Sequence, residues 1–140
     1  MITAIDTNVI SALWDAGDAL CKTAQDVLEE AQKSGGLTIC GAVHAELIAA
    51  PGRTEEFVDR FCEEAGIVVE WELGEKVWRV AGAAFQGYAA RRRKQRRAEA
   101  RRILADFLIG AHALVNGYKL LTLDARVYRA AFPRLGIRSL

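Results

Sequence analysis

Short apolar runs alternate with longer helical patterns from one end of this chain to the other. Five runs predict strands: Ile2–Ile5, Leu37–Cys40, Ile67–Trp71, Lys119–Leu123 and Ile137–Leu140. The segments between them have helical patterns: Val9–Trp14, Ala19–Lys33, Ala42–Ala50, Thr54–Ala65, Glu75–Arg97, Asp106–Val115 and Ala125–Ala131. Such alternation predicts a parallel sheet covered by helices. We therefore expect an α/β fold, with residues 1–140 forming one domain.

Composition is that of an ordinary globular protein. Apolar residues make up 51% of the chain and charged residues 26%, which is typical of a soluble domain. No apolar run is long enough to span a membrane, and we expect no secretory signal because no basic segment precedes the first apolar run. The three cysteines, Cys21, Cys40 and Cys62, form no paired motif. This favours reduced thiols and a cytoplasmic location.

Four acidic residues stand where an apolar run has ended or turned: Asp6, Glu46, Asp106 and Asp124. Asp6 and Asp124 follow the first and fourth predicted strands, and Glu46 lies near the start of the helix after the second strand. The carboxyl ends of parallel strands share one edge of a sheet, where ligands bind. We therefore expect these three acids to meet at that edge.

Asp106 reaches the same edge if the element lengths match. A helix from Asp106 to Val115 runs roughly 15 Å in one direction. The strand Lys119–Leu123 returns roughly 17 Å in the other. Asp106 and Asp124 should therefore lie at the same level of the fold.

Carboxylates gathered in this way need compensation. Two of them about 4 Å apart repel by roughly 4 kcal/mol at an effective dielectric of about 20. A hard divalent cation such as Mg²⁺ relieves the repulsion and keeps coordination positions open for phosphate. Taken singly, each acid has a structural alternative: Asp6, Asp106 and Asp124 could be helix N-caps, and Glu46 a solvated helix residue.

The segment from residue 91 to residue 102 is strongly basic. It holds one acid, Glu99, among eight basic residues: Arg91, Arg92, Arg93, Lys94, Arg96, Arg97, Arg101 and Arg102. The net charge of the chain is only +1, so the rest of the molecule is mildly acidic. Such a strip suits a phosphate backbone or an acidic partner. The alternative is a solvated helix end.

The acidic motifs together resemble those of the PIN domain family. They are Asp6-Thr7-Asn8-Val9, Glu46-Leu47, Ala105-Asp106 and Leu121-Thr122-Leu123-Asp124, in this order. The length and layout resemble the VapC toxins of type II toxin–antitoxin systems, over essentially the whole chain. The resemblance implies a three-layer α/β/α fold with a five-stranded parallel sheet in the order 3-2-1-4-5.

The resemblance also implies an activity and partners. The activity is a Mg²⁺- or Mn²⁺-dependent endoribonuclease that cuts RNA with metal-activated water. Asp6, Glu46 and Asp106 match the family's three core acids, Asp124 matches a more variable fourth, and Thr7, Asn8 and Thr122 match the polar positions that orient them. Such toxins usually form homodimers, and a small antitoxin blocks the site. The basic residues Arg91, Arg92, Arg93, Lys94, Arg96 and Arg97 would then hold the RNA backbone or the antitoxin.

Two other functions compete with this hypothesis. One is a catalytically inactive PIN-fold module that binds nucleic acid or protein, although the presence of all four acids favours an enzyme. The other is a phosphatase for small phosphate esters, although the basic strip favours a long polyanion. His44 and His112 lie in apolar helical surroundings and are expected in the core rather than at a metal.

Overall fold

The computed structural model of the chain describes residues 1–95 and 103–140. Its elements are β1 (Thr3–Ile5), α1 (Thr7–Trp14), α2 (Cys21–Ser34), β2 (Leu37–Cys40), α3 (Gly41–Ile48), α4 (Glu55–Ala65), β3 (Ile67–Glu70), α5 (Glu75–Gln95), α6 (Leu104–Asn116), β4 (Lys119–Thr122), α7 (Ala125–Ala131) and β5 (Ile137–Ser139). The predicted alternation of strands and helices is confirmed. The predicted extension of the fifth helix to Arg97 lies outside the described residues.

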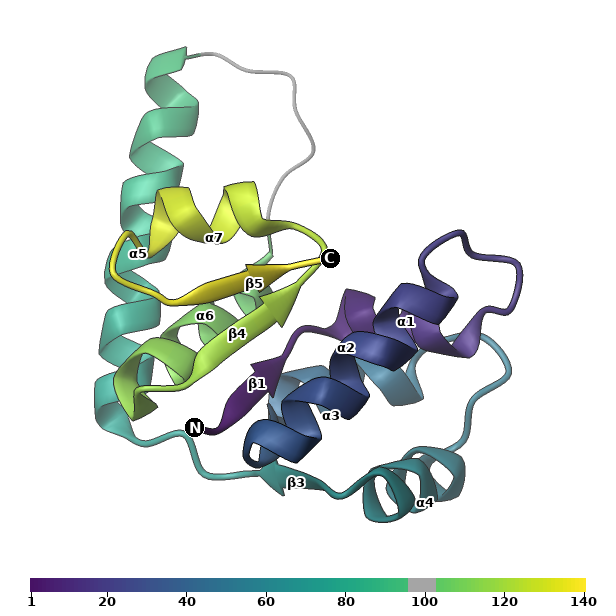
Figure 1. The fold of residues 1–140 in the computed structure, drawn as a ribbon. Coiled ribbons are helices and arrows are strands. Elements are labelled where there is room, and N and C mark those ends of the chain that lie inside the picture. The colour runs from purple at the N-terminus through teal and green to yellow at the C-terminus, as the bar shows by residue number, and fades with distance from the viewer. Residues whose placement is uncertain (96–102) are drawn as a thin grey trace.

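The strands form one parallel sheet in the order β3-β2-β1-β4-β5. Helices lie on both sides of it (Figure 1), which confirms the expected α/β/α architecture. The central strand β1 pairs Ala4 with Thr38 of β2 and with Leu120 of β4. Strands β1 and β2 are buried throughout, as apolar strands covered on both faces should be. The edge strands are less covered, and Val68 of β3 is 64% exposed.

The turn between α6 and β4 places the two later acids at one end of the fold. Gly117 ends α6 with a φ of 71°, a left-handed conformation that favours glycine. The amide of Tyr118 then donates to the carbonyl of Ala113 over 2.9 Å, and the chain reverses into β4. Helix and strand run in opposite directions, so Asp106 and Asp124 both lie at the carboxyl edge of the sheet, as the length argument predicted.

A close contact between α6 and the segment after α7 fixes the position of α7. Gly110, in the middle of α6, lies so near the ring of Phe132 that a Cβ there would overlap it. Phe132 is itself buried, so the ring has little room to move aside. The C-terminal end of α7 is thereby anchored to α6, and Tyr128 of α7 lines the acidic pocket.

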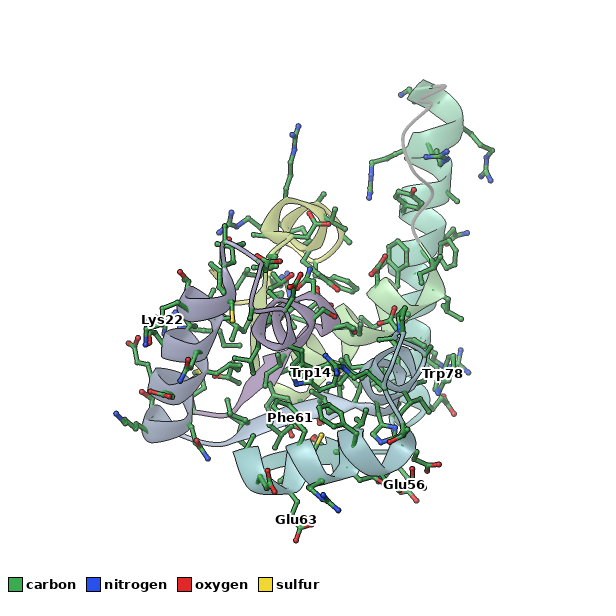
Figure 2. The ribbon with its side chains drawn as sticks, turned by 90° about the vertical axis from the view of Figure 1, so that its right-hand side faces the viewer. Trp14, Lys22, Glu56, Phe61, Glu63 and Trp78 are labelled. Atoms are coloured by element: carbon green, nitrogen blue, oxygen red, sulfur yellow. The ribbon has the colours of Figure 1, made fainter. Side chains whose placement is uncertain are left out.

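An aromatic contact joins α1 to α4 on the other side of the molecule. The rings of Trp14 and Phe61 meet edge to face, with centroids 5.1 Å apart. Figure 2 labels both residues in the interior of the molecule, while Lys22 and Glu63 point outward. None of the helices in the described part of the chain is both long and apolar enough to cross a membrane.

Candidate active site at the carboxyl edge of the sheet

Asp6 is the buried carboxylate of the edge. It follows β1 directly and is only 5% exposed. Its backbone amide donates to the carbonyl of Leu121 over 2.9 Å, which ties it to the neighbouring strand β4. Thr122 donates its hydroxyl to Oδ2 of Asp6 over 2.7 Å. The neighbouring strand β4 therefore fixes both the backbone and the side chain of this residue.

The pKa of Asp6 is raised from 3.8 to about 6. Burial is the main cause, because a charged carboxylate loses hydration there. The negative charge of Asp106 raises the pKa further, and the hydrogen bond from Thr122 lowers it. The carboxylates of Asp6 and Asp106 are thus close enough to oppose each other's ionisation, which is the conflict that a cation would relieve.

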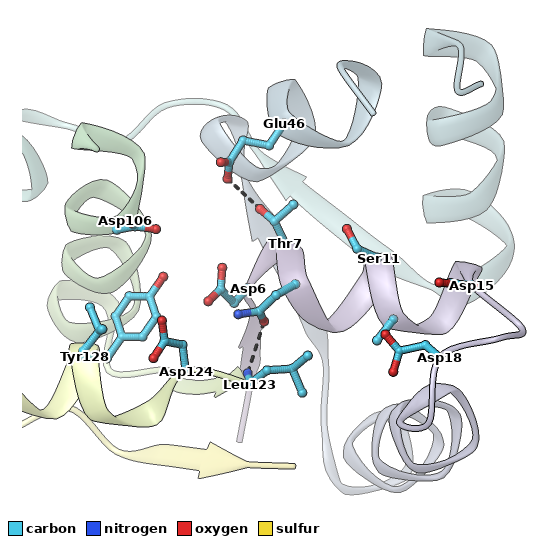
Figure 3. A pocket seen from close by; sticks show the side chains of 13 residues that line it. Asp6, Thr7, Ser11, Asp15, Asp18, Glu46, Asp106, Leu123, Asp124 and Tyr128 are labelled. Atoms are coloured by element: carbon cyan, nitrogen blue, oxygen red, sulfur yellow. Dashed lines mark hydrogen bonds between the residues drawn. The ribbon is translucent and has the colours of Figure 1, made fainter. Parts of the chain in front are cut away.

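Glu46 joins the edge from α3. The hydroxyl of Thr7 donates to Oε1 of Glu46 over 2.6 Å, between residues 39 positions apart. Thr7 begins α1 immediately after Asp6. The two consecutive residues therefore supply the buried acid and the hydroxyl that orients Glu46. Figure 3 shows this bond beside the carboxylate of Asp6.

The loop after β4 presents Asp124. The amide of Asp124 donates to the hydroxyl oxygen of Thr122 over 3.0 Å. The amide of Leu123 donates to Oδ1 of Asn8 over 3.1 Å, the second dashed contact in Figure 3. Thr122 therefore acts twice, since it donates to Asp6 and accepts from the turn that carries Asp124. The three polar residues named from the sequence, Thr7, Asn8 and Thr122, all make contacts of this kind.

Helix capping does not account for the acids. Asp6 and Asp124 occupy the N-cap positions of α1 and α7, but neither side chain makes the capping hydrogen bond. Asp106 lies in the first turn of α6, where the N-cap position belongs to Ile103. A carboxylate in that turn also interacts favourably with the helix dipole.

All four predicted acids line one pocket of about 520 Å³. Four other polar residues that line it were not predicted from the sequence: Ser11, Asp15, Asp18 and Tyr128. Ser11 and Asp15 follow Thr7 at helical spacings of four, and Tyr128 follows Asp124 by four, so the periodicity could have indicated them. Asp18 comes from the loop after α1, where no periodic signal exists.

A divalent cation in this pocket would meet carboxylate, hydroxyl and amide oxygens, which suit a hard ion such as Mg²⁺. Within residues 1–95 and 103–140, no three Asp, Glu, His or Cys side chains are grouped tightly enough to hold one ion. The acids thus surround a shared space rather than a single point. Mg²⁺ usually takes one or two carboxylates and keeps several waters. The oxygen donors that line the pocket therefore suit such a cation.

The described part of the basic strip lies on the last turns of α5. Arg91, Arg92, Arg93 and Lys94 belong to this helix, which extends beyond the sheet in Figure 1. None of these four side chains lines the acidic pocket. The predicted Arg96 and Arg97, with Arg101 and Arg102, lie outside the described residues.

The two histidines are buried away from the pocket, as expected from the sequence. Nε2 of His44 lies 2.8 Å from Oδ1 of Asp59. Nε2 of His112 lies 3.3 Å from Oε1 of Glu70. Both make protein contacts in the core.

The fold and pocket define a parallel α/β protein with an acidic site at the carboxyl edge of its sheet. A family model for the PIN domain matches residues 3–133. The chain therefore belongs to the PIN domain family, as the sequence motifs predicted. No curated protein matches the chain significantly in sequence.

Solved structures of toxin–antitoxin proteins have the same fold. VapBC2 from Rickettsia felis, bound to a promoter DNA fragment, matches with a TM-score of 0.68 and 17% identity over 99% of this chain and 98% of that chain. VapBC-1 from nontypeable Haemophilus influenzae matches with a TM-score of 0.65 and 21% identity, over 99% of this chain and 98% of that chain. VapC20 from Mycobacterium tuberculosis is a toxin that cleaves the sarcin–ricin loop. It matches with a TM-score of 0.55 and 20% identity, over 84% of this chain and 85% of that chain.

Proposed function

We propose that this chain is a metal-dependent endoribonuclease that acts as the toxin of a toxin–antitoxin system. The observation that carries the proposal is the pocket lined by Asp6, Glu46, Asp106 and Asp124, in which the most buried acid faces a second negative charge. The similarity to VapBC complexes and to a toxin that cleaves the sarcin–ricin loop supports both an RNA substrate and an antitoxin partner. A homodimer is part of the same proposal.

Asp6 and Asp106 would hold Mg²⁺ or Mn²⁺. The cation, when bound, would supply an activated water and positive charge for the phosphate oxygens. Thr122 keeps the carboxylate of Asp6 in one orientation through its 2.7 Å hydrogen bond. Burial of Asp6 also excludes bulk water, which strengthens electrostatic interactions at the site.

Glu46 and Asp124 complete the polar wall of the pocket. We assign them to contacts made through water, to a second cation or to proton transfer. Thr7 holds Glu46 by a 2.6 Å hydrogen bond. Asn8 and Thr122 hold the turn of Asp124. Thr7 thus orients Glu46, while Asn8 and Thr122 fix the turn that carries Asp124.

RNA needs a basic contact outside this acidic pocket, because the pocket itself repels phosphate until a cation is bound. Arg91, Arg92, Arg93 and Lys94 on α5 would hold the RNA backbone. Arg96 and Arg97 extend the same basic segment in the sequence. An antitoxin tail rich in carboxylates could use this surface as well.

The alternative is a PIN-fold module that binds nucleic acid or protein without catalysis. Loss of one or more of the acids would favour it. Here all four acids line the same pocket, Thr7 and Thr122 donate to Glu46 and Asp6, and Asn8 accepts from the turn before Asp124. This arrangement favours the enzyme.

The proposal is tested by incubating the protein with RNA in Mn²⁺ or Mg²⁺, and in EDTA. We expect cleavage products only when the metal is present, and no turnover of p-nitrophenyl phosphate. RNA that is bound but stays intact in Mn²⁺ would establish the binding module instead. Turnover of the small ester without RNA cleavage would establish a phosphatase.

A further inference from the structure

The hydroxyl of Tyr128 is buried beside the acids and has no hydrogen-bond partner. Tyr128 lies on α7, is 2% exposed and lines the pocket, and Figure 3 shows its ring directed towards the acids. In the described part of the chain, its Oη and the indole nitrogen of Trp14 are the buried side-chain polar atoms without a partner. Such atoms are rare in native proteins and call for an explanation.

The charges around this hydroxyl make it a donor. Burial raises the pKa of the Tyr128 phenol far above its ordinary value, and the negative charges of Asp6, Asp106 and Glu46 raise it further. A phenol hydroxyl in such surroundings is a hydrogen-bond donor to a carboxylate. It also lies close enough to Asp6 to lower the pKa of that carboxyl, although it falls short of full hydrogen-bond geometry.

The partner that this hydroxyl can reach is a protein group. Its oxygen is closed to solvent, so neither bulk water nor an RNA phosphate can contact it without a rearrangement. Asp6 is the acid that it already influences. Thr122 takes up one side of that carboxylate through Oδ2, and a carboxylate has acceptor positions for several donors.

We propose that Tyr128 is a positioning residue, whose hydroxyl donates to the carboxylate of Asp6 when the pocket binds a divalent cation. Thr122 and Tyr128 would then hold this ligand from two sides. Partners that orient a metal ligand commonly change metal affinity about 10-fold to 100-fold when they are removed. The inference rests on the proposed function, because it requires that Asp6 bind a cation.

The test compares Tyr128→Phe with Tyr118→Phe. The second variant also removes a tyrosine hydroxyl, but one that makes a hydrogen bond. Tyr118 donates to Oε1 of Glu70 over 2.7 Å, outside the pocket. Calorimetric titration of metal-stripped protein with Mn²⁺ should show about tenfold weaker binding or more for Tyr128→Phe, and wild-type affinity for Tyr118→Phe. Urea unfolding in EDTA should show the reverse, with a lower midpoint for Tyr118→Phe alone.

The outcomes separate this inference from the proposed function. Wild-type Mn²⁺ affinity in Tyr128→Phe, together with lost affinity in Asp6→Asn, overturns the positioning role and leaves the nuclease proposal standing. A lower unfolding midpoint for Tyr128→Phe in EDTA shows a hydroxyl that stabilises the fold, and also overturns the role. A wild-type protein that binds no Mn²⁺ removes the proposed function, and this inference with it.

Discussion

The carboxylates of Glu70 and Asp6 each accept a hydroxyl hydrogen bond of 2.7 Å, but their other neighbours differ. Glu70 accepts from Tyr118 at both oxygens, over 2.7 and 3.0 Å, and His112 lies 3.3 Å from it. Asp6 accepts from Thr122 over 2.7 Å, but it faces the negative charge of Asp106. The Glu70 cluster pairs an acid with donors, while the pocket pairs an acid with another acid.

We infer from this difference that the Glu70 cluster stabilises the fold, whereas the acidic pocket at Asp6 binds a ligand. Burial lowers the pKa of His112, so its ring is neutral at physiological pH and sits in the core as a polar contact of Glu70. At Asp6, burial and repulsion make ionisation unfavourable in the folded protein. Natural proteins commonly accept such a loss of stability at functional sites. The same carboxylate-to-amide change should therefore have opposite effects at the two positions.

The largest effect on stability should come from Asp6. Its pKa is about 6 in the folded protein against 3.8 ordinarily, so the folded state binds this proton more tightly than the unfolded chain does. Raising the pH from about 3 to neutrality in EDTA should then remove about 3 kcal/mol of stability. Asp6→Asn should lack this loss and be more stable than the wild type at pH 7.

Urea unfolding of both proteins across that pH range measures the difference. Groups far from the pocket titrate equally in the two proteins, so the gap between the curves reports Asp6 together with the acids coupled to it. Parallel curves for the wild type and Asp6→Asn would mean that Asp6 is not held at a raised pKa, and would remove the contrast with Glu70.

A smaller effect of opposite sign is expected at Glu70. Glu70→Gln weakens charged hydrogen bonds from Tyr118 and His112, and should cost about 1.5 to 3 kcal/mol. The measurement is the urea midpoint in EDTA at pH 7. A stabilised Glu70→Gln protein would place this cluster in the same class as the pocket.

The smallest effect should come from the basic strip. In EDTA, replacing Arg91–Arg93 with Ala in an Asp6→Asn background should reduce the slope of log Kd for single-stranded RNA against log salt by about 2. The control replaces Lys22, Arg79 and Arg138, three cations outside the strip that are each paired with an acid. Equal changes of slope in the two proteins would mean that total charge matters and the strip does not.

Most of the fold could be predicted from the sequence because its two periodicities are clear. The apolar runs of β1 and β2 are buried throughout, and the first helix begins at Thr7, two residues before the predicted Val9. The strand order came from the family resemblance, since no local pattern specifies which strands are neighbours. The exposure of Val68 could not be predicted, because an apolar edge strand has the same pattern as an inner one.

The sequence could predict that the four acids lie at one edge of the sheet, because their positions relative to the strand ends can be read from it. Their exact grouping could not be predicted, since it depends on side-chain packing across elements far apart in the sequence. Tyr128 illustrates this limit. Tyr128 lines the pocket on a helix whose end is anchored to α6 by the contact of Phe132 with Gly110, and no motif around residue 128 records that contact.

The central claim is that the carboxylates of the pocket carry out metal-dependent RNA cleavage. Its most direct test is the single-turnover cleavage rate of one RNA in Mn²⁺ by the wild type, Asp6→Asn and Glu70→Gln. Asp6→Asn should lose about a thousandfold, equivalent to about 4 kcal/mol of transition-state stabilisation, while Glu70→Gln keeps the wild-type rate. Cleavage by Asp6→Asn at the wild-type rate would contradict the claim.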